Sequence, residues 1–419
     1  MNVLHVCHSD GFGGAAIGAK RLHYTMLEQG ITSRLLVTKK YSDNDTVIEL
    51  PEDLGRSFKE SINKKIRSYH KTDNPIIRSL NIFGRGAAKY INSTNVDVVQ
   101  FHWVNADTIR IGEISRINKP LVWKLPDMWA FSGAEHYILP NDPLRYKLGY
   151  TKANRPSHES GFDLNRYIWN YKNICWKKAR FSVVCPSKWL ARCAQESQLF
   201  GHRDIYNIAN PIDLANYSPG NKLVCREQFG LPTDKKLVLF AALASFTDER
   251  KGFHYFNQAL EKLSHIEVDK KFDIIILGNH GSEMDSLHGY KVHNLGRFTN
   301  QNDMINAYRA ADFHVFPTQA DNLPNVVKEA SACGLPCVGF DVGGMPDMVK
   351  HKENGYLATP FDVDDLQQGL QWMVDQDLKA LSSKVRAQAE EMHNPNKCVN
   401  SYLEVYEKTI RAFHNSSNT

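Results

Sequence analysis

The sequence predicts an α/β protein with two doubly wound parallel sheets, and three observations carry this prediction. The chain has 419 residues, which is enough for two domains with full hydrophobic cores. Short apolar runs bounded by turn residues alternate with helical patterns in both halves. Residues 212–235, between the halves, are rich in turn residues and charge. We therefore expect two Rossmann-like domains that face a cleft, because open parallel sheets bind ligands beyond the carboxyl ends of their strands.

The apolar runs are expected to form buried strands, since each is short and bounded by turn residues. They are residues 2–8, 33–39, 96–103, 120–126 and 181–187 in the first half, and 236–243, 272–279, 313–318 and 336–341 in the second. Helical patterns lie between strands at residues 16–30, 253–263 and 304–311 and after Pro324, as crossovers between parallel strands require.

The domains are expected at residues 1–212 and 213–395, with the linker at the turn-rich stretch between the halves. Residues 396–419 contain an amphipathic helix pattern that no strand follows. Such a helix must pack on a core that has already formed, and the first domain is the candidate.

Composition limits the classes of function. Hydrophobic residues make up 42% and charged residues 23% of the chain, as in soluble globular proteins. The net charge of +5 suits an anionic ligand or an anionic membrane surface but is too weak to argue for nucleic acid. The eight cysteines are scattered, so we expect buried free thiols in a reducing compartment. No signal segment is apparent and no apolar run approaches about 18 residues, so we expect a cytoplasmic protein without a membrane span.

A glycine-rich loop follows the first expected strand. Gly13 and Gly14 precede a helix, and glycines there let backbone N–H groups approach a phosphate. The string also fits a G-x-G-x-x-A dinucleotide fingerprint. That interpretation needs an acidic residue at the end of the next strand, where Thr38 and Lys39 stand. A turn whose glycines serve only the backbone geometry is the remaining alternative.

Three consecutive loops of the second half carry cations, carboxylates or glycines at the ends of expected strands. Arg250 and Lys251 stand at the entrance to a helix, where two cations suit a diphosphate and a solvated turn is the alternative. The stretch QADNLPNVVKEASACG at 319–334 carries two acids, and Gly343 and Gly344 precede a further helix. Together these loops predict an anion site at one edge of the second sheet.

In order and spacing, these features resemble the nucleotide-sugar glycosyltransferases of family 4, which have the GT-B architecture. The motifs that carry the resemblance are Gly13-Gly14, QFHWVN at 100–105, WKLPDMWAFSGAEHY at 123–137, CPSKWL at 185–190, NIANPID at 207–213, RKGF at 250–253, LGRF at 295–298, YRAADFHVFPT at 308–318 and DNLPNVVKEASACGLPCVGFDVGGMPDMV at 321–349. The resemblance covers nearly the whole chain. It implies that the N-terminal domain binds an acceptor and that the C-terminal domain binds a nucleotide-sugar donor.

The resemblance implies donor contacts for the two acids. Asp321, where relatives normally have glutamate, would contact sugar hydroxyls near the anomeric carbon, and Glu329 would hold the ribose hydroxyls. The backbone amides of Asn322, Leu323 and Asn325 would meet the sugar and the phosphate. A helix cap at Asp321 and a solvated helix position at Glu329 are the alternatives.

The resemblance also implies a retaining transfer that needs no metal or other cofactor, in which the leaving phosphate helps to take the acceptor proton. The protein would position the substrates and stabilise charge on the departing nucleoside diphosphate, with Arg250, Lys251 and the glycine-loop amides. Asp362 and Asp364 have the D-x-D form of a metal site, but they precede a helix pattern and indicate a helix start.

One departure from the family pattern lies on the acceptor side, and another in the cationic loop, where many relatives have an arginine at the position of Phe246 and Arg250 is the candidate substitute. Relatives usually have a histidine before the aspartate of WKLPDMWAFSG, where this chain has Pro126, and Asp127 and His136 are the candidates for part of its role. Further acceptor-side candidates follow an expected strand at its carboxyl end: His102, Trp103 and Asn105. A structural role for the histidine is the alternative.

A basic segment of the first domain, residues 56–89, includes a helical pattern that carries Phe58, Ile62, Ile66 and Tyr69 among lysines and arginines. Such a helix suits peripheral contact with an anionic inner membrane, and a solvated surface helix is the alternative.

The expected activity is transfer of a hexose to a growing surface polysaccharide or lipid-linked oligosaccharide, of the O-antigen, capsule or exopolysaccharide type. The alternatives are a GT-B epimerase or hydrolase of nucleotide sugars and a non-catalytic sugar-nucleotide-binding protein.

Overall fold

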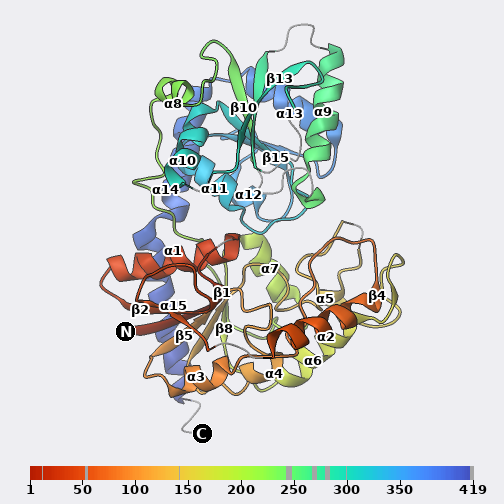
Figure 1. The fold of residues 1–419 in the computed structure, drawn as a ribbon, viewed down its shortest axis with the longest axis vertical. Coiled ribbons are helices and arrows are strands. Elements are labelled where there is room, and N and C mark those ends of the chain that lie inside the picture. The colour runs from red at the N-terminus through yellow and green to blue at the C-terminus, as the bar shows by residue number, and fades with distance from the viewer. Residues whose placement is uncertain are drawn as a thin grey trace. The chain divides into compact units, whose positions relative to one another are not determined.

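The computed structural model describes residues 1–11, 13–51, 55–140, 142–241, 248–266, 271–278, 284–298 and 300–415. The chain divides into two compact units (Figure 1). One unit comprises Met1–Pro211 and Pro395–Thr419, and the other comprises Ile212–Asn394. Each holds a seven-stranded, mostly parallel sheet with helices on both faces. The prediction of two Rossmann-like α/β units is therefore confirmed.

The first unit has the strand order β3-β2-β1-β5-β6-β8-β9. Its strands are β1 (Asn2–Ser9), β2 (Thr32–Lys39), β3 (Val47–Glu49), β5 (Val98–Phe101), β6 (Leu121–Lys124), β8 (Ser182–Cys185) and β9 (Ile205–Asn207), with a separate antiparallel pair β4 (His70–Lys71) and β7 (Ser160–Gly161). Its helices are α1 (Gly14–Glu28), α2 (Arg56–Ser68), α3 (Ala87–Ser93), α4 (Ile111–Ile114), α5 (Arg145–Leu148), α6 (Leu164–Trp176), α7 (Lys188–Glu196) and α15 (Pro395–Asn415).

Both faces of the first sheet are covered by apolar side chains, which explains why its strands read as continuous apolar runs. Leu22 of α1 and Tyr402 of α15 pack against Val3 and Val98 on one face. Residues of α3, α4, α6 and α7 cover the other face. The helix α15 lies beside α1, so the last helix of the chain closes the core of the first unit.

The second unit has the strand order β12-β13-β11-β10-β14-β15-β16. Its strands are β10 (Lys236–Ala241), β11 (Phe272–Leu277), β12 (Ser286–Leu287), β13 (Tyr290–Gly296), β14 (Phe313–Phe316), β15 (Cys337–Phe340) and β16 (Tyr356–Ala358). Its helices are α8 (Lys222–Gln228), a 3-10 turn η1 (Glu249–Lys251), α9 (Phe253–Ile266), α10 (Gln301–Ala310), α11 (Asn325–Ala332), α12 (Met345–Met348), α13 (Val363–Val374) and α14 (Leu378–His393).

The strand order places a topological switch point in each sheet. In the first unit β1 lies between β2 and β5, and in the second β10 lies between β11 and β14, so the crossovers leave these strands in opposite directions. Open α/β sheets bind ligands outside the carboxyl ends of the strands at such a point. A ligand site is therefore expected at the loops that follow β1, β5, β10 and β14.

Three smaller predictions are also settled. The Asp362 side chain accepts hydrogen bonds from the amides of Asp364 (2.9 Å) and Asp365 (3.1 Å), so it starts α13 as predicted. All eight cysteines lie within the described residues and none is paired, and every one except Cys175 is buried. Each helix that the structure describes is too short or too polar to cross a membrane.

Candidate functional site

A charged cluster lies beyond the ends of β10 and β14. Lys251 Nζ is 2.8 Å and Arg250 Nη1 is 3.2 Å from the same carboxylate oxygen of Asp321. The Asp321 side chain is only 14% exposed. Burial raises the pKa of this carboxyl, but Lys251 and Arg250 outweigh the burial and hold the pKa below its ordinary value. Asp321 is therefore ionised and forms an ion pair with each of the two cations.

Of the two cations, Lys251 keeps capacity for an anion. Arg250 also donates to the Ala320 carbonyl at 2.8 Å and pairs with Asp248 at 3.3 Å. The Lys251 ammonium donates one hydrogen bond within the described part of the chain, to Asp321, although an ammonium carries three N–H groups. Its remaining donors can meet a phosphate oxygen.

Backbone contacts fix the cationic loop to the loop that follows β14. The Arg250 carbonyl accepts from the Gln319 amide at 2.8 Å and from the Thr318 hydroxyl at 3.0 Å. Gly252 has φ +77°, and a Cβ there would stand 1.8 Å from the Pro317 carbonyl oxygen. Only glycine permits this approach, which brings Arg250 and Lys251 to Asp321.

The loop that follows β15 is held against the same acid. The Gly344 amide donates to the Asp321 carbonyl at 3.1 Å, and Gly343 adopts φ +56° directly beside it. Of the predicted donor residues, the structure thus brings Arg250, Lys251, Asp321, Gly343 and Gly344 together at the edge of the second sheet.

Glu329 is buried inside α11 and accepts a 3.0 Å hydrogen bond from the Tyr308 hydroxyl of α10. Burial and the nearby carboxylate raise the pKa of Tyr308 well above its ordinary value, so the phenol stays a donor. The solvated alternative for Glu329 is therefore wrong. The cap alternative for Asp321 is also wrong, because α11 begins after Pro324 without a side-chain cap.

Asn322 and Leu323 lie in the turn between the two acids, and Asn325 opens α11. The first N–H groups of a helix have no carbonyl partner within it, and the helix dipole favours negative charge at this end. The arrangement suits a ligand with a negative centre between two hydroxyl-bearing ends.

In the first unit, Gly13 precedes α1 with φ +95°, and a Cβ on it would meet nothing within 4 Å. Glycine is therefore required there by the backbone angle rather than by space. Gly14 is the first residue of α1. Phe12 lies outside the described residues.

The three acceptor-side candidates that follow β5 differ in their burial and contacts. His102 is fully buried, with Nε2 2.9 Å from His5 Nδ1, and burial lowers its pKa well below the ordinary value. This placement favours the structural interpretation of His102. Trp103 is half-buried, with its ring 5.9 Å from that of His136. Asn105 is buried, and its Nδ2 has no partner among the described residues.

Asp127 and His136 form one hydrogen-bonded chain that ends at Ser79. Asp127 Oδ2 is 2.6 Å from His136 Nδ1, and His136 Nε2 is 2.8 Å from Ser79 Oγ. The other Asp127 oxygen accepts from the Trp129 amide at 2.9 Å. Both ring nitrogens of His136 are thereby fixed, which sets its orientation next to Trp103.

Lys172 of α6 organises the loop that carries this chain. Its ammonium is fully buried and donates to the carbonyls of Trp129, Ser132 (3.2 Å) and Gly133 (2.7 Å). It also lies 3.7 Å from the centre of the Trp129 ring. Three carbonyls thus converge on one cation, a geometry that a neutral side chain does not reproduce.

Sequence reasoning missed Ser79, Lys172 and Tyr308. The only signal was for Lys172, a lysine within the apolar pattern of α6, where a charge needs several partners if it is buried. Ser79 bonds to His136, 57 residues away, and Tyr308 bonds to Glu329, 21 residues away. No local sequence pattern indicates such distant contacts.

The fold and these strand-end loops define the class of protein: two Rossmann-like units of the GT-B type. A glycosyltransferase from Rickettsia africae matches with a TM-score of 0.63 at 16% identity, over 98% of each chain. HepE of Anabaena, solved in complex with UDP-glucose, matches with a TM-score of 0.60 at 16% identity, over 97% of this chain and 100% of that one. At such identities the likeness shows the fold alone.

Sequence comparisons match part of the chain. Residues 235–376, which lie within the second unit, match the family model described as "Glycosyl transferases group 1". The D-inositol 3-phosphate glycosyltransferase of Mycolicibacterium smegmatis is 32% identical over 200 residues, which is 45% of this chain and 43% of that protein. The N-acetyl-alpha-D-glucosaminyl L-malate synthase of Bacillus anthracis is 26% identical over 220 residues, or 50% and 55%. The chain spans about half the length of the curated relatives it matches.

Proposed function

We propose that the protein is a retaining, metal-independent hexosyltransferase of family 4 that uses a nucleoside-diphosphate sugar. The observation that carries the proposal is the cluster of Arg250, Lys251 and Asp321 at the switch point of the second sheet, followed by buried Glu329. Phosphate charge meets the cations, sugar hydroxyls meet Asp321, and ribose hydroxyls meet Glu329. HepE, a fold neighbour, has been solved with UDP-glucose, which supports a donor of this kind.

In the proposed reaction the bond from the anomeric carbon to the phosphate oxygen breaks while the acceptor oxygen bonds to that carbon from the same face. The acceptor proton passes to the leaving phosphate oxygen. Arg250, Lys251 and the amides between the two acids stabilise the diphosphate as its charge grows, with Gly13 and Gly14 as further predicted donors. The protein contributes positioning and charge, and no covalent intermediate is required.

On the acceptor side, Asp127 and His136 are proposed to take part of the role that Pro126 cannot fill. His136 is oriented by Asp127 at one nitrogen and by Ser79 at the other. Its Nε2 is the atom proposed to exchange the Ser79 hydrogen bond for one with an acceptor group. Trp103 and Asn105 stay acceptor-side predictions, while the burial of His102 gives it a supporting role.

A thermal-shift screen with UDP, GDP and ADP and their common sugars tests the donor site. We expect one nucleoside diphosphate to raise the melting temperature, because ligands that bind only the folded state stabilise it. Lys251→Met and Asp321→Asn should lose most of that shift. Lys262→Met is the matched control, since Lys262 pairs with Asp364 on an exposed surface. If no nucleoside diphosphate stabilises the wild type, the donor proposal fails.

The two alternative functions predict different results in assays with the donor. A nucleotide-sugar epimerase or hydrolase turns over the stabilising donor without any acceptor. A non-catalytic binder shows the thermal shift, but transfers no labelled sugar to glycan or lipid extracts. The proposed acceptor is a growing surface polysaccharide or lipid-linked oligosaccharide, and retention of the anomeric configuration in the product is the decisive measurement.

We also propose a cytoplasmic location with peripheral contact at an anionic inner membrane, through α2. Phe58 on this helix and Tyr69 directly after it are 71% and 55% exposed, and Lys64, Lys65 and Arg67 lie among the exposed residues. Cations and exposed aromatic residues together suit an anionic interface. Flotation with anionic and with neutral vesicles tests this proposal, and equal recovery with both contradicts it.

A further inference from the structure

A two-part groove lies in the first unit where the residues after α2 meet the start of α6. One part has a volume of about 530 Å³ and the other of about 580 Å³. Both are lined by Gly161, Phe162 and Tyr167, so the two parts adjoin each other. The strand-end loops described above do not contribute to either part.

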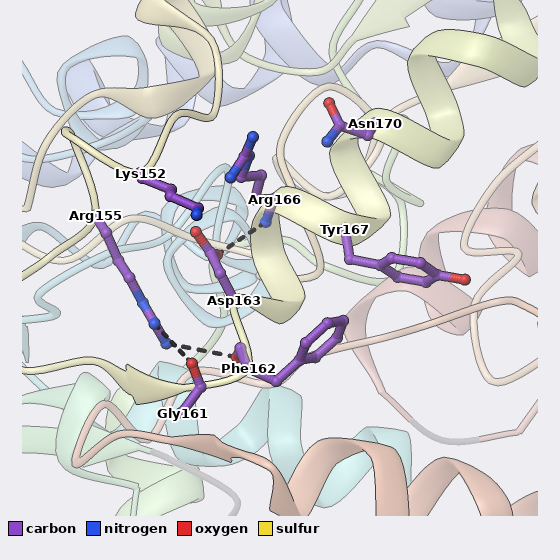
Figure 2. Close-up of a pocket in the computed structure, with 8 residues that line it drawn as sticks. All are labelled: Lys152, Arg155, Gly161, Phe162, Asp163, Arg166, Tyr167 and Asn170. Atoms are coloured by element: carbon purple, nitrogen blue, oxygen red, sulfur yellow. Dashed lines mark hydrogen bonds between the residues drawn. The ribbon is translucent and has the colours of Figure 1, made fainter.

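The first part is cationic. Figure 2 shows Lys152, Arg155 and Arg166 at one end and the rings of Phe162 and Tyr167 at the other. In the described part of the chain, the Lys152 and Arg166 side chains have no hydrogen-bond or ion-pair partner. Arg155 is different, because it donates to the backbone carbonyls of residues 160–162. Two cations are thus available for an anion.

The single carboxylate in this part of the groove does not neutralise them. Asp163 Oδ2 lies 2.7 Å from Arg145, whose buried guanidinium takes up its charge. The Asp163 Oδ1 atom accepts from the Arg166 backbone amide at 3.0 Å, which caps α6. The available charge on Lys152 and Arg166 therefore exceeds that of the carboxylate beside them.

The second part of the groove is mainly apolar, although Ser68 and Lys71 also line it. Ile66 and Ile82 form its floor and pack against the core of the first unit. Tyr69, Phe162 and Tyr167 line it with 55%, 43% and 50% of their surface exposed. Exposed aromatic residues gathered around a hollow are unfavourable in water unless another apolar surface covers them.

We propose that this groove holds the lipid part of the acceptor, with a diphosphate at Lys152 and Arg166 and the isoprenoid chain along Ile66, Tyr69 and Tyr167. A free phosphate would leave the apolar part empty, and a neutral glycan would leave both cations unpaired. An anionic headgroup joined to a hydrocarbon chain matches both parts at once. The assignment rests on the proposed function in naming the ligand as an acceptor.

The test uses a monomeric C15 isoprenoid diphosphate as the probe and calorimetry on the full chain as the measurement. We expect the probe to bind, and Lys152→Glu with Arg166→Glu to weaken it by at least about tenfold. Tyr167→Ala should also weaken binding. The controls are Lys177→Glu with Lys178→Glu, exposed cations at the far end of α6, and Ile174→Ala, 77% exposed on the same helix. Each control should bind as wild type does.

Several outcomes overturn the assignment: no binding of the probe, equal binding of inorganic diphosphate, or equal loss in the control variants. Binding of a short-chain phosphatidylglycerol as tight as that of the probe would make the groove a phospholipid site and sink the acceptor assignment. The thermal shift induced by nucleoside diphosphates is read on the same samples. Groove variants should retain it, and its absence from the wild type would refute the donor proposal without touching the lipid result.

Discussion

The carbonyl oxygen of Asp321 occupies the place where residue 343 would carry its side chain. A Cβ built on Gly343 would stand 2.0 Å from that oxygen, and the amide of Gly344 donates to it at 3.1 Å. The loops that follow β14 and β15 are therefore fitted to each other at a contact that admits no side chain. This contact fixes the Asp321 backbone while Lys251 and Arg250 hold its carboxylate.

Gly343→Ala should weaken donor binding by at least about tenfold, since a shift of the Asp321 backbone by a fraction of an ångström misplaces its carboxylate. Gly230→Ala is the control. Gly230 also has a positive φ, of +61°, but a Cβ there would meet nothing within 4 Å. Both variants should lose about 1–2 kcal/mol of unfolding free energy from the backbone angle alone. Calorimetry with the stabilising nucleotide separates them, and equal affinities would contradict this explanation.

Tyr308→Phe should lower the free energy of unfolding by about 1–3 kcal/mol, because the buried Glu329 carboxylate loses a donor. The same change at Tyr402 is a matched control. The Tyr402 ring is fully buried, but its hydroxyl has no partner among the described residues. Urea unfolding of the two variants compares the cost, and a Tyr402→Phe protein as unstable as Tyr308→Phe would rule out the hydrogen bond as the cause.

His314 should make the second unit less stable in mild acid. Its ring is fully buried, neither nitrogen has a partner in the described part of the chain, and burial lowers its pKa to about 3 from 6.5. Below pH 6.5 the His314 ring takes up a proton in the unfolded chain but stays neutral in the folded protein. The unfolding free energy then falls by up to about 1.4 kcal/mol per pH unit toward pH 3.

His314→Leu should remove this part of the acid dependence, measured as the difference in unfolding free energy between about pH 7.5 and about pH 5. His265→Leu replaces an exposed histidine on α9 and should leave the difference as in the wild type. If His314→Leu keeps the full wild-type difference, other buried histidines account for it.

Lys172→Met should lower both the unfolding free energy and kcat, since three buried carbonyls lose a shared donor and the loop that carries His136 loosens. The expected loss of stability is roughly 3 kcal/mol. Lys172→Arg should restore charge but not function, because the bulkier guanidinium does not fit the fully buried site of the ammonium. Lys177→Met, at an exposed position one residue past α6, is the control for removing a lysine. Unchanged kcat in Lys172→Met would show that the loop is rigid without it.

The sequence predicted the parallel strands that are buried on both faces, since these read as continuous apolar runs. It missed β9 and β16, which have three residues each, and β13, where half-buried residues obscure the pattern. Such strands form because they pair with a neighbouring strand. Which strand is the neighbour depends on the topology of the sheet and not on the local sequence.

For the candidate site, the rule about strand ends located Arg250, Lys251 and Asp321 but could not show that they touch. The same rule also selected His102, whose ring points inward to His5. The rule could not exclude His102, because the position of a residue at a strand end does not specify which way its side chain points. Contacts between distant segments, such as His136 with Ser79, require the fold itself.

The core of the first unit includes Tyr402 and Tyr406 of α15, packed with Val3 and Val98 from the opposite end of the chain. A ribosome therefore releases the first 211 residues, and then the whole of Ile212–Asn394, before the segment that completes this core appears. The second unit is contiguous and can fold while synthesis continues. The first must wait with one face of its sheet covered by α1 but not yet by α15, so the later-made unit is expected to finish folding before the earlier one.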